Sequence, residues 1–426
     1  MKRMVNAMKK TIGLFVVILT ALILVSCGDS KPSNEFTIAT WAAGTELSEF
    51  NEIVDKVNEA AEGKYVINTL SIPSDYYIKL STQIAAKKAP EFFWLTQELI
   101  SKYADLGAIV DLTDYMEKSE VLNADDYYEG VIQSALFNDK YWGLPWIANP
   151  FIVYYNKTMF NELGVTPPSE TDDWSWDDFI EVSRQIAGKT YRGKSVYATV
   201  IEGNPNIETF IWSGGGDILA SDGKTVILDS EGTKRGVGNL VTLFRENLIP
   251  RYNTISYARN VYFEKQEVAM YMGGIQDDFE RKITLMPEAD RFELGYAPIP
   301  TDPSGKSNPF DWTASTVMSQ SVKDKDLAYE ALEALTLAFF EWKIAPPIKG
   351  TLENIKTIAP DKIPALATIE HALANARSAN YTEKWTELSD LYLWRGLYLP
   401  ILQNPEVDYI DLIDKAAANM RSKIGA

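Results

Sequence analysis

Tryptophans and planar polar side chains near the predicted ends of strands are the residues best suited to bind a small molecule. The chain holds 11 Trp and 22 Tyr, so flat apolar surfaces are plentiful. Planar carboxylate and amide groups add directed hydrogen bonds, and an unpaired buried hydroxyl costs about 1–3 kcal/mol. The binding candidates are Trp41, Trp94, Trp146, Trp212, Trp312, Glu91, Gln97, Asp278 and Asp311, together with Gly273 and Gly274, which would allow a close backbone approach.

Each tryptophan in this set has an alternative role as an ordinary core residue, because Trp is usually well buried. Predicted loop positions at the ends of sheets favour the binding role for Trp41, Trp94, Trp212 and Trp312. The polar candidates are weaker, and the two glycines could equally serve a tight turn.

Catalytic, metal-binding and nucleic-acid-binding functions find little support in the sequence. The single histidine, His371, cannot form a histidine-based triad or a zinc cluster of His and Cys. Residues 188–195 match a phosphate-binding loop, but a predicted helix precedes them and a strand-like segment follows, the reverse of what that loop needs. A formal charge of −18 would repel phosphate backbones. We therefore predict no enzyme activity, no cofactor, no metal and no nucleic-acid partner.

Alternating strand and helix patterns position the first candidates. Between residues 36 and 95 the pattern runs strand, helix, strand, helix, strand. That order predicts a parallel sheet covered by helices, in which ligands bind beyond the carboxyl ends of the strands. Trp41 and Trp94 are both placed at such ends.

A second unit is predicted to begin after Trp146. Residues 151–155 have the pattern of a strand, and further helices and strands follow as far as residue 298. The prolines within residues 298–303 predict a hinge or linker, because proline lacks the N–H that a strand needs. The tail from residue 364 to residue 424 is predicted to be helical almost throughout.

A secretory signal is predicted at the N-terminus. A positive segment precedes an uncharged apolar run that starts at Thr11 and ends at Leu24-Val25-Ser26-Cys27. This ending resembles a bacterial lipobox, which implies that Cys27 is lipidated and becomes the first mature residue. Because Cys27 is the only cysteine of the chain, we favour this interpretation over an uncleaved membrane helix. Either interpretation tethers the rest of the chain outside the cytoplasm.

Several motifs follow one another in a set order from Phe36 onward. They are residues 81–91, 103–112, 140–145, 154–179, 263–270 and 296–300. Their order resembles the family of bacterial extracellular solute-binding proteins that includes the maltose-binding type. Glu91 stands where that family usually has aspartate, and residues 339–364 depart from its pattern, so the third crossover between lobes is not placed.

The resemblance implies a type II periplasmic-binding-protein-like α/β fold, with two lobes of sheet and flanking helices and the ligand in the cleft between them. Hinge closure would bury the ligand and present it to an ABC importer in the membrane. Trp385 resembles a sugar-stacking position of the family, and Trp146 lies at the first crossover. A mono- or oligosaccharide is therefore the expected ligand. The alternatives are a polyamine, peptide or anion on the same fold, or a polysaccharide-degrading surface lipoprotein.

We expect a monomer that is anchored outside the cytoplasm by the lipid on Cys27. The predicted organisation is a signal peptide at 1–26, a flexible linker at 27–35, an N-terminal lobe of 36–146 plus 302–345, and a C-terminal lobe of 150–298 plus 350–426.

Overall fold

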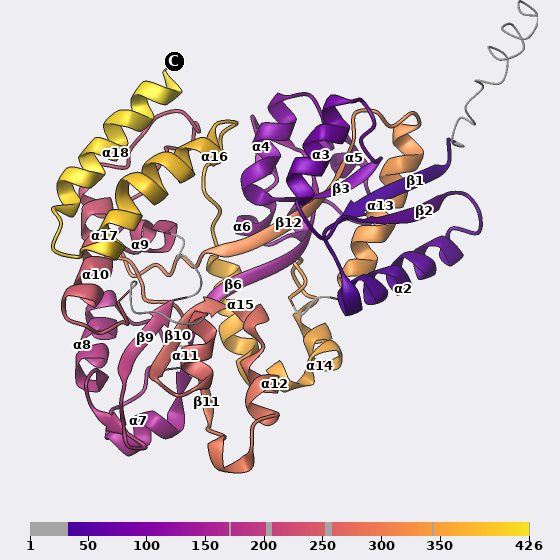
Figure 1. The fold of residues 1–426 in the computed structure, drawn as a ribbon. Coiled ribbons are helices and arrows are strands. Elements are labelled where there is room, and N and C mark those ends of the chain that lie inside the picture. Colours follow the sequence, from indigo (N-terminus) through magenta and orange to yellow (C-terminus); the bar gives the residue numbers. More distant parts are fainter. Residues whose placement is uncertain (1–32, 170–171, 202–206, 252–257, 343–344, 426) are drawn as a thin grey trace, which may run out of the picture.

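The computed structural model describes residues 33–169, 172–201, 207–251, 258–342 and 345–425. In this part the chain forms two lobes side by side, each built from β-strands with helices packed on them (Figure 1). The predicted α/β class is therefore confirmed. The predicted signal peptide and Cys27 lie outside the described residues, and within those residues no helix has the length and apolar character needed to span a bilayer. The domain boundaries stay a prediction.

The N-terminal lobe begins with three parallel strands that are connected by helices. β1 (Glu35–Thr40) pairs with β2 (Val66–Ser71) on one side and with β3 (Phe92–Thr96) on the other. The connections are α2 (Gly44–Ala60) and α3 (Tyr76–Ala85). All five residues of β3 are buried, as expected for the middle strand of a sheet covered on both faces. The strand and helix alternation predicted for this region is confirmed.

One long strand belongs to both lobes. β6 (Leu144–Asn156) is buried along all 13 residues. Its first half pairs with β12 (Asp311–Met318), which also pairs with β3 and completes the first sheet. Its second half pairs with β10 (Val268–Gly274) and β11 (Leu294–Ala297), and β9 (Tyr197–Ile201) pairs with β10. The strand order β2-β1-β3-β12-β6-β10-β9 therefore runs from one lobe into the other.

The remaining helices cover these strands (Figure 1). Those on the N-terminal side are α4 (Gln97–Asp105), α5 (Thr113–Lys118), α6 (Glu129–Gln133) and α13 (Lys325–Phe339). Those on the C-terminal side are α7 (Lys157–Leu163), α8 (Trp176–Ile186), α9 (Ile207–Ser213), α10 (Glu231–Arg245), α11 (Arg259–Glu264), α12 (Phe279–Thr284), α16 (Trp385–Leu388), α17 (Leu399–Gln403) and α18 (Tyr409–Ile424). In the sequence, α14 (Ile355–Ile358) and α15 (Leu366–Asn375) come after α13 of the N-terminal side and before α16 of the C-terminal side. Helix α15 packs on β6 and α6.

Helices α9 and α10 approach each other closely because glycines stand where they touch. A Cβ atom on Gly236 would lie 1.8 Å from the backbone oxygen of Phe210, and one on Gly214 would lie 2.1 Å from the backbone oxygen of Gly232. Larger residues would therefore push the helices apart. The close contact holds Trp212, which precedes Gly214, inside the C-terminal lobe.

The prediction of a helical tail was wrong at residues 376–384. This stretch, called here the connecting segment, leads from α15 to α16 without forming a helix. Both lobes bind it: the Ser101 hydroxyl donates to the Thr382 carbonyl at 2.8 Å, and the Asn380 amide donates to the Leu219 carbonyl at 2.9 Å. Such contacts with distant residues override the local preference for helix, which is a weak energy term.

Candidate functional site

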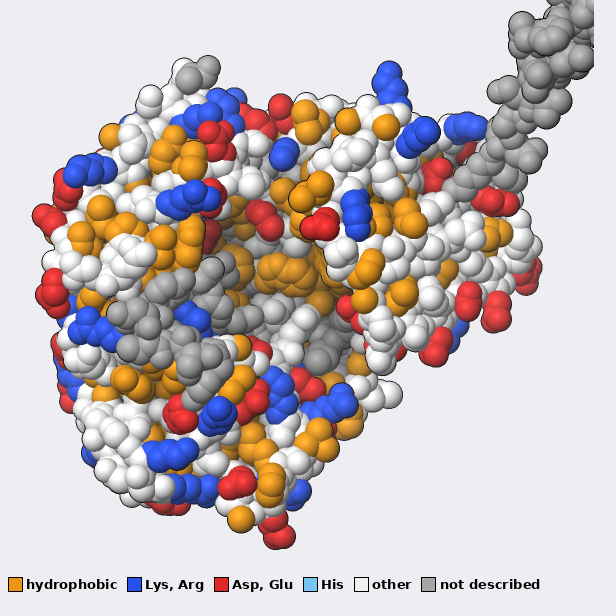
Figure 2. Space-filling model, in the orientation of Figure 1, with side chains coloured by type: hydrophobic (Ala, Val, Ile, Leu, Met, Phe, Trp, Pro, Cys, Tyr) orange, Lys and Arg blue, Asp and Glu red, His pale blue; other side chains and the backbone are white. Residues whose placement is uncertain are grey.

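A hollow between the two lobes is the candidate binding site. Figure 2 shows one face of the molecule hollowed between the lobes, with hydrophobic side chains on the floor of the hollow. The strands β6 and β12 pass through the same region in Figure 1. Helix α4 from the N-terminal lobe, helix α9 from the C-terminal lobe and the connecting segment meet near this crossing, as the contacts below show.

Gln97 joins α4 to β12 and to the connecting segment. This first residue of α4 is 1% exposed. Its Oε1 atom accepts hydrogen bonds from the backbone N–H of Thr313 at 2.6 Å and from the Thr313 hydroxyl at 2.8 Å. Its Nε2 atom donates to the Tyr381 hydroxyl at 2.7 Å. The structure thus places Gln97 at the predicted region, but three bonds to the protein already engage its side-chain amide.

A buried carboxyl, that of Glu208, and a half-buried one, that of Glu98, come from opposite lobes and approach each other beside Gln97. Glu208, on α9, is 9% exposed, and no other side chain in the described part of the chain hydrogen-bonds to it. Burial raises the pKa of Glu208 to about 7, and the nearby charges of Asp217 and Glu98 contribute. Burial also raises the pKa of Glu98, on α4, whose Oε1 atom accepts a hydrogen bond from the Thr96 hydroxyl at 2.5 Å. A ligand that donates hydrogen bonds could bind both carboxyls, because an ionised carboxylate has about four lone-pair sites and can accept several bonds.

Trp212 is covered by other side chains. The guanidinium of Arg377 lies over its ring, 4.5 Å from the centroid, and Phe310 stacks nearby at 6.3 Å. Arg377 also forms an ion pair with Asp217, which accepts a hydrogen bond from the Trp212 indole N–H at 3.1 Å. The ring is fully buried in this arrangement. A ligand could stack on Trp212 only after Arg377 moves.

Trp41, Trp94 and Trp146 form one aromatic cluster. The centroids of Trp41 and Trp94 are 4.9 Å apart, and those of Trp94 and Trp146 are 4.4 Å apart. Trp94 and Trp146 are buried, whereas Trp41 is partly exposed and also contacts Tyr76 and Tyr77. The structure therefore brings these three candidates together, and Trp41 is the one with ring surface left for a ligand.

Asp311 stands at the crossing of the two long strands. As the first residue of β12 it is 2% exposed, and its Oδ1 atom accepts a hydrogen bond from the backbone N–H of Asn149 at 2.7 Å. Its Oδ2 atom is buried and has no hydrogen-bond partner among the described residues. Burial raises the pKa of Asp311 to about 8, so the carboxyl is mostly protonated at neutral pH.

At Gly273 and Gly274, which were predicted to let a ligand approach the backbone, the groups that come close are side chains of the protein itself. A Cβ on Gly274 would lie 2.3 Å from the side-chain amide nitrogen of Asn149, and one on Gly273 would lie 2.4 Å from the ring of Tyr271. The Asn149 side chain is held there because its oxygen accepts a hydrogen bond from the backbone N–H of Gln276 at 3.1 Å.

The other candidates are more dispersed. Trp312 is partly exposed and packs against the cores of both lobes. Trp385 is buried against Tyr381, with ring centroids 4.9 Å apart. Asp278 follows β10 in a left-handed conformation, 3.7 Å from the ammonium group of Lys362.

Glu91 is separated from these residues. It precedes β3, so it lies at the amino end of the strand, whereas Gln97 follows the carboxyl end. Its carboxylate accepts a hydrogen bond from the backbone N–H of Thr37 at 2.8 Å. The structure therefore does not bring Glu91 to the crossing region.

The sequence interpretation missed four residues of this region: Glu98, Glu208, Arg377 and Tyr381. Glu98 is the neighbour of a chosen residue at a strand end, so its position could have been selected by the same rule. Arg377 and Tyr381 lie in the connecting segment, which had the pattern of a helix. The inward orientation of Glu208 depends on the packing of α9 and has no signal in the sequence.

The fold and the hollow define a class of two-lobed, ligand-binding proteins. A family model for bacterial extracellular solute-binding proteins matches residues 41–338. The chain belongs to this family. Its members are binding proteins that act outside the cytoplasm, and the predictions of family and of a binding role are confirmed.

Relatives and solved structures agree with the family. A putative binding protein of Brucella abortus is 25% identical over 88% of this chain and 90% of its own length. The erythritol/L-threitol-binding protein of Mycolicibacterium smegmatis is 23% identical over 78% of this chain and 72% of its own. The sugar-binding protein MalE of Xanthomonas citri has a similar fold, with a TM-score of 0.75 at 19% identity over 92% of this chain and 97% of that one. At this identity the structural likeness shows the fold alone.

Proposed function

We propose that this chain captures a mono- or oligosaccharide outside the cytoplasm, encloses it by hinge closure, and delivers it to an ABC importer. Relatives named for erythritol and L-threitol and for diacetylchitobiose support a polyhydroxy ligand. A structural neighbour from Listeria monocytogenes is an ABC substrate-binding protein in complex with cycloalternan, at a TM-score of 0.74 and 19% identity over 92% of this chain. A lipid on Cys27 would hold the protein at the membrane.

The carboxyl pair of Glu98, which is half-buried, and Glu208, which is buried, carries the proposal about the ligand. Because they come from different lobes, a ligand between them contacts both lobes at once. Sugar hydroxyls can donate to each carboxylate, while Trp41 offers an aromatic face for the C–H side of the ring. An anionic ligand would be repelled by the same pair, so the anion alternative is disfavoured.

A thermal-shift panel tests the ligand class. Neutral mono- and oligosaccharides, polyols including erythritol, polyamines and amino acids are added separately to the protein lacking its first 29 residues. A ligand at 100 times its dissociation constant adds about 2.7 kcal/mol to the free energy of unfolding. We expect a shift with at least one neutral carbohydrate or polyol. A panel in which only polyamines raise the melting temperature would refute the carbohydrate proposal.

Two substitutions locate the site once a ligand is found. Glu98→Gln and Glu208→Gln each remove a charged acceptor, and we expect each to weaken binding roughly ten- to a hundredfold, as for hydrogen bonds to charged groups. Glu91→Gln is the matched control, because Glu91 lies at the opposite end of β3. Equal losses in all three variants would contradict the placement of the ligand between α4 and α9.

Anchoring and delivery need separate experiments. Cys27→Ser should move the chain from the membrane fraction to the soluble extracytoplasmic fraction, whereas Ser26→Ala should leave it at the membrane. Uptake of the identified sugar should then fall in cells that lack this chain and return when the chain is supplied. A Cys27→Ser protein that stays in the membrane fraction would overturn the lipid anchor.

A further inference from the structure

Arg377 is held in a fixed orientation, with part of its side chain open to solvent. The side chain is 31% exposed, although the Trp212 ring beneath it is fully buried. Stacking on that ring, at 4.5 Å from the centroid, and the ion pair with Asp217 together fix the plane of the guanidinium. The side chain is therefore already oriented before a ligand arrives.

Several hydrogen-bond donors of this guanidinium have no partner in the described part of the chain. An arginine side chain carries five N–H donors in a planar fork. Here Nη2 donates to the carboxylate of Asp217. Whichever hydrogen of Nη2 makes this bond, the other still points parallel to an N–H of Nε or of Nη1. Such a parallel pair suits two neighbouring acceptor oxygens on one molecule.

The same guanidinium lies close to Glu208, one of the two carboxyls of the hollow. Trp212 and Glu208 are four residues apart on α9, so they share one face of that helix. Asp217, which binds Arg377, is near enough for its charge to raise the pKa of Glu208. The backbone N–H of Arg377 donates to the Pro309 carbonyl at 3.3 Å, just before β12 begins at the strand crossing. An oriented donor and a buried acceptor therefore lie next to each other on the side of the hollow formed by α9.

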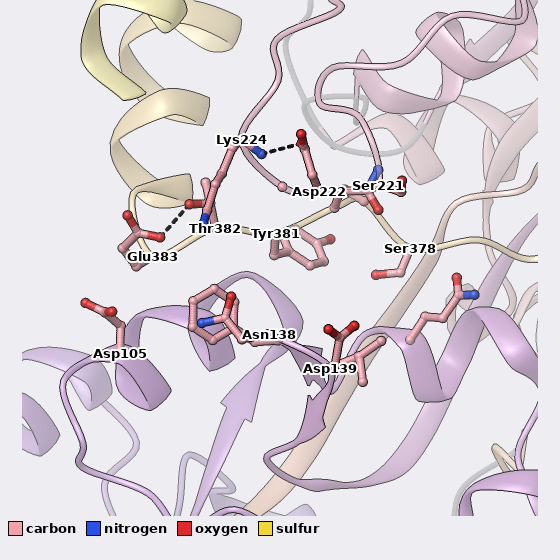
Figure 3. Close-up of a pocket in the computed structure, with 16 residues that line it drawn as sticks. Asp105, Asn138, Asp139, Ser221, Asp222, Lys224, Ser378, Tyr381, Thr382 and Glu383 are labelled. Carbon is pink, nitrogen blue, oxygen red and sulfur yellow. Dashed lines mark hydrogen bonds between the residues drawn. The ribbon is translucent and has the colours of Figure 1, made fainter. Parts of the chain in front are cut away.

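The open side of Arg377 does not belong to the other pocket between the lobes. That pocket encloses about 550 Å³ and is lined by residues 378–383 of the connecting segment and by residues of both lobes. Figure 3 shows Tyr381 with Asp139 and Asp222 around it. The described residues that line it do not include Arg377. The donors of Arg377 therefore serve the hollow, where Glu208 lies.

The charge of Arg377 is already balanced by Asp217, and this decides which oxygen atoms it can recognise. A carboxylate on a ligand would gain little from Arg377 and would be repelled by Glu98 and Glu208. A hydroxyl differs, because its oxygen can accept a hydrogen bond from Arg377 while its hydrogen is donated to Glu208. Two neighbouring hydroxyls therefore match this site better than an acid group does.

We propose that Arg377 selects the ligand of the hollow, by donating from adjacent N–H groups to the oxygens of two neighbouring hydroxyls on a neutral carbohydrate or polyol. Glu208 accepts hydrogen bonds from the same hydroxyls. This inference rests on the proposed function, because it assigns a role in the same site. Trp212 then supports the arginine instead of stacking on the sugar itself.

Calorimetric titrations with erythritol, maltose and diacetylchitobiose test the proposal on the protein lacking its first 29 residues. Arg377→Met keeps an apolar side chain on Trp212 but removes every donor, so we expect binding to weaken roughly ten- to a hundredfold. Arg377→Lys keeps the charge but not the planar fork, and should recover little of the loss. Arg421→Lys is the matched control, because Arg421, on α18, forms a similar ion pair with Asp229.

A second variant and a second probe separate a contact with the ligand from a role in holding the fold. Asp217→Asn removes the ion pair but leaves the donors of Arg377, so binding should weaken less than about fivefold. Butane-1,4-diol lacks the neighbouring hydroxyls of erythritol, and its weak binding should be the same in the wild type and in Arg377→Met. Urea unfolding of each variant measures any loss of stability separately.

Three outcomes would overturn the proposal. The first is an equal loss of affinity in Arg377→Met and Asp217→Asn, which would mean that Arg377 acts only through the fold. The second is a loss of less than about twofold in Arg377→Met for every probe that the wild type binds, the size of an ordinary surface substitution. Carbohydrate binding would then remain, and the proposed function would stand. The third is a wild-type protein that binds none of the three probes, and the wider thermal-shift panel then decides whether the proposed function falls as well.

Discussion

The buried carboxyl of Asp311, at the crossing of β6 and β12, leads to a prediction about how stability changes with pH. The pKa of Asp311 is about 8 in the folded protein, against an ordinary value of 3.8. Between these values the folded state keeps a proton that the unfolded state has released, so unfolding becomes easier as pH rises. The loss is about 1.4 kcal/mol per pH unit for one group. It is complete above about pH 8 and absent below about pH 4.

Asp311→Asn removes this dependence without removing the hydrogen bond to Asn149, because the amide oxygen can still accept it. From pH 5.0 to pH 7.5 the wild-type protein should lose about 3 kcal/mol more stability than the variant. The free-energy cost of burying the amide is the same at both pH values, so it cancels when the two changes in stability are compared.

Urea unfolding at the two pH values measures the effect directly. Asp302→Asn is a suitable control, because hydrogen bonds lower the pKa of Asp302 below its ordinary value of 3.8. This carboxyl is therefore ionised in both states at pH 5.0 and at pH 7.5, and its replacement should leave the pH dependence unchanged. If the wild type and Asp311→Asn differ by the same free energy at pH 5.0 and at pH 7.5, the carboxyl ionises in place. The inference from its burial would then be wrong.

Three further predictions concern the crossing region. Gln97→Ala should lower the free energy of unfolding by about 2–4 kcal/mol in urea titrations, because it leaves buried partners unpaired on two segments. Gly274→Ala should cost about 1–3 kcal/mol by overpacking against Asn149, whereas Gly143→Ala meets side-chain atoms no closer than 2.8 Å and should cost less. Affinity for a hydroxyl-donating ligand should rise as pH passes through about 7, because Glu208 ionises, and calorimetry on Glu208→Gln should show a flat profile.

Much of the fold could be predicted from local patterns in the sequence. The alternation between residues 36 and 95 predicted β1 to β3 and their helices, and the family motifs predicted two lobes. The long strand was predicted only from residue 151, although it starts at Leu144. Its first half was not predicted because it contains Pro145 and Pro150, and proline is rare in central strands. Here Pro145 lies opposite Ser315, where the pairing of β12 is irregular.

The site could be predicted only in part, because it depends on contacts between distant residues. Arg377 covers Trp212 from a position more than a hundred residues away, so no local pattern shows that the ring is buried. Trp94 and Trp41 both follow from the same rule about strand ends, yet only packing decides that Trp94 is inside and Trp41 is partly outside. The pKa of Glu208 is raised first by its burial and then by the charges of Asp217 and Glu98, all of which depend on how α9 is packed.

The position of β12 in the chain has a consequence for synthesis. The first sheet needs β12 between β3 and β6, yet β12 follows β3 by roughly 200 residues, which take on the order of 10–40 s to synthesise at 5–20 residues/s. Until then one edge of β3 has no partner and the first sheet is incomplete, whereas the pairing of β6 with β10 and β11 does not need β12. Most of the protein is therefore made before the N-terminal lobe can be completed.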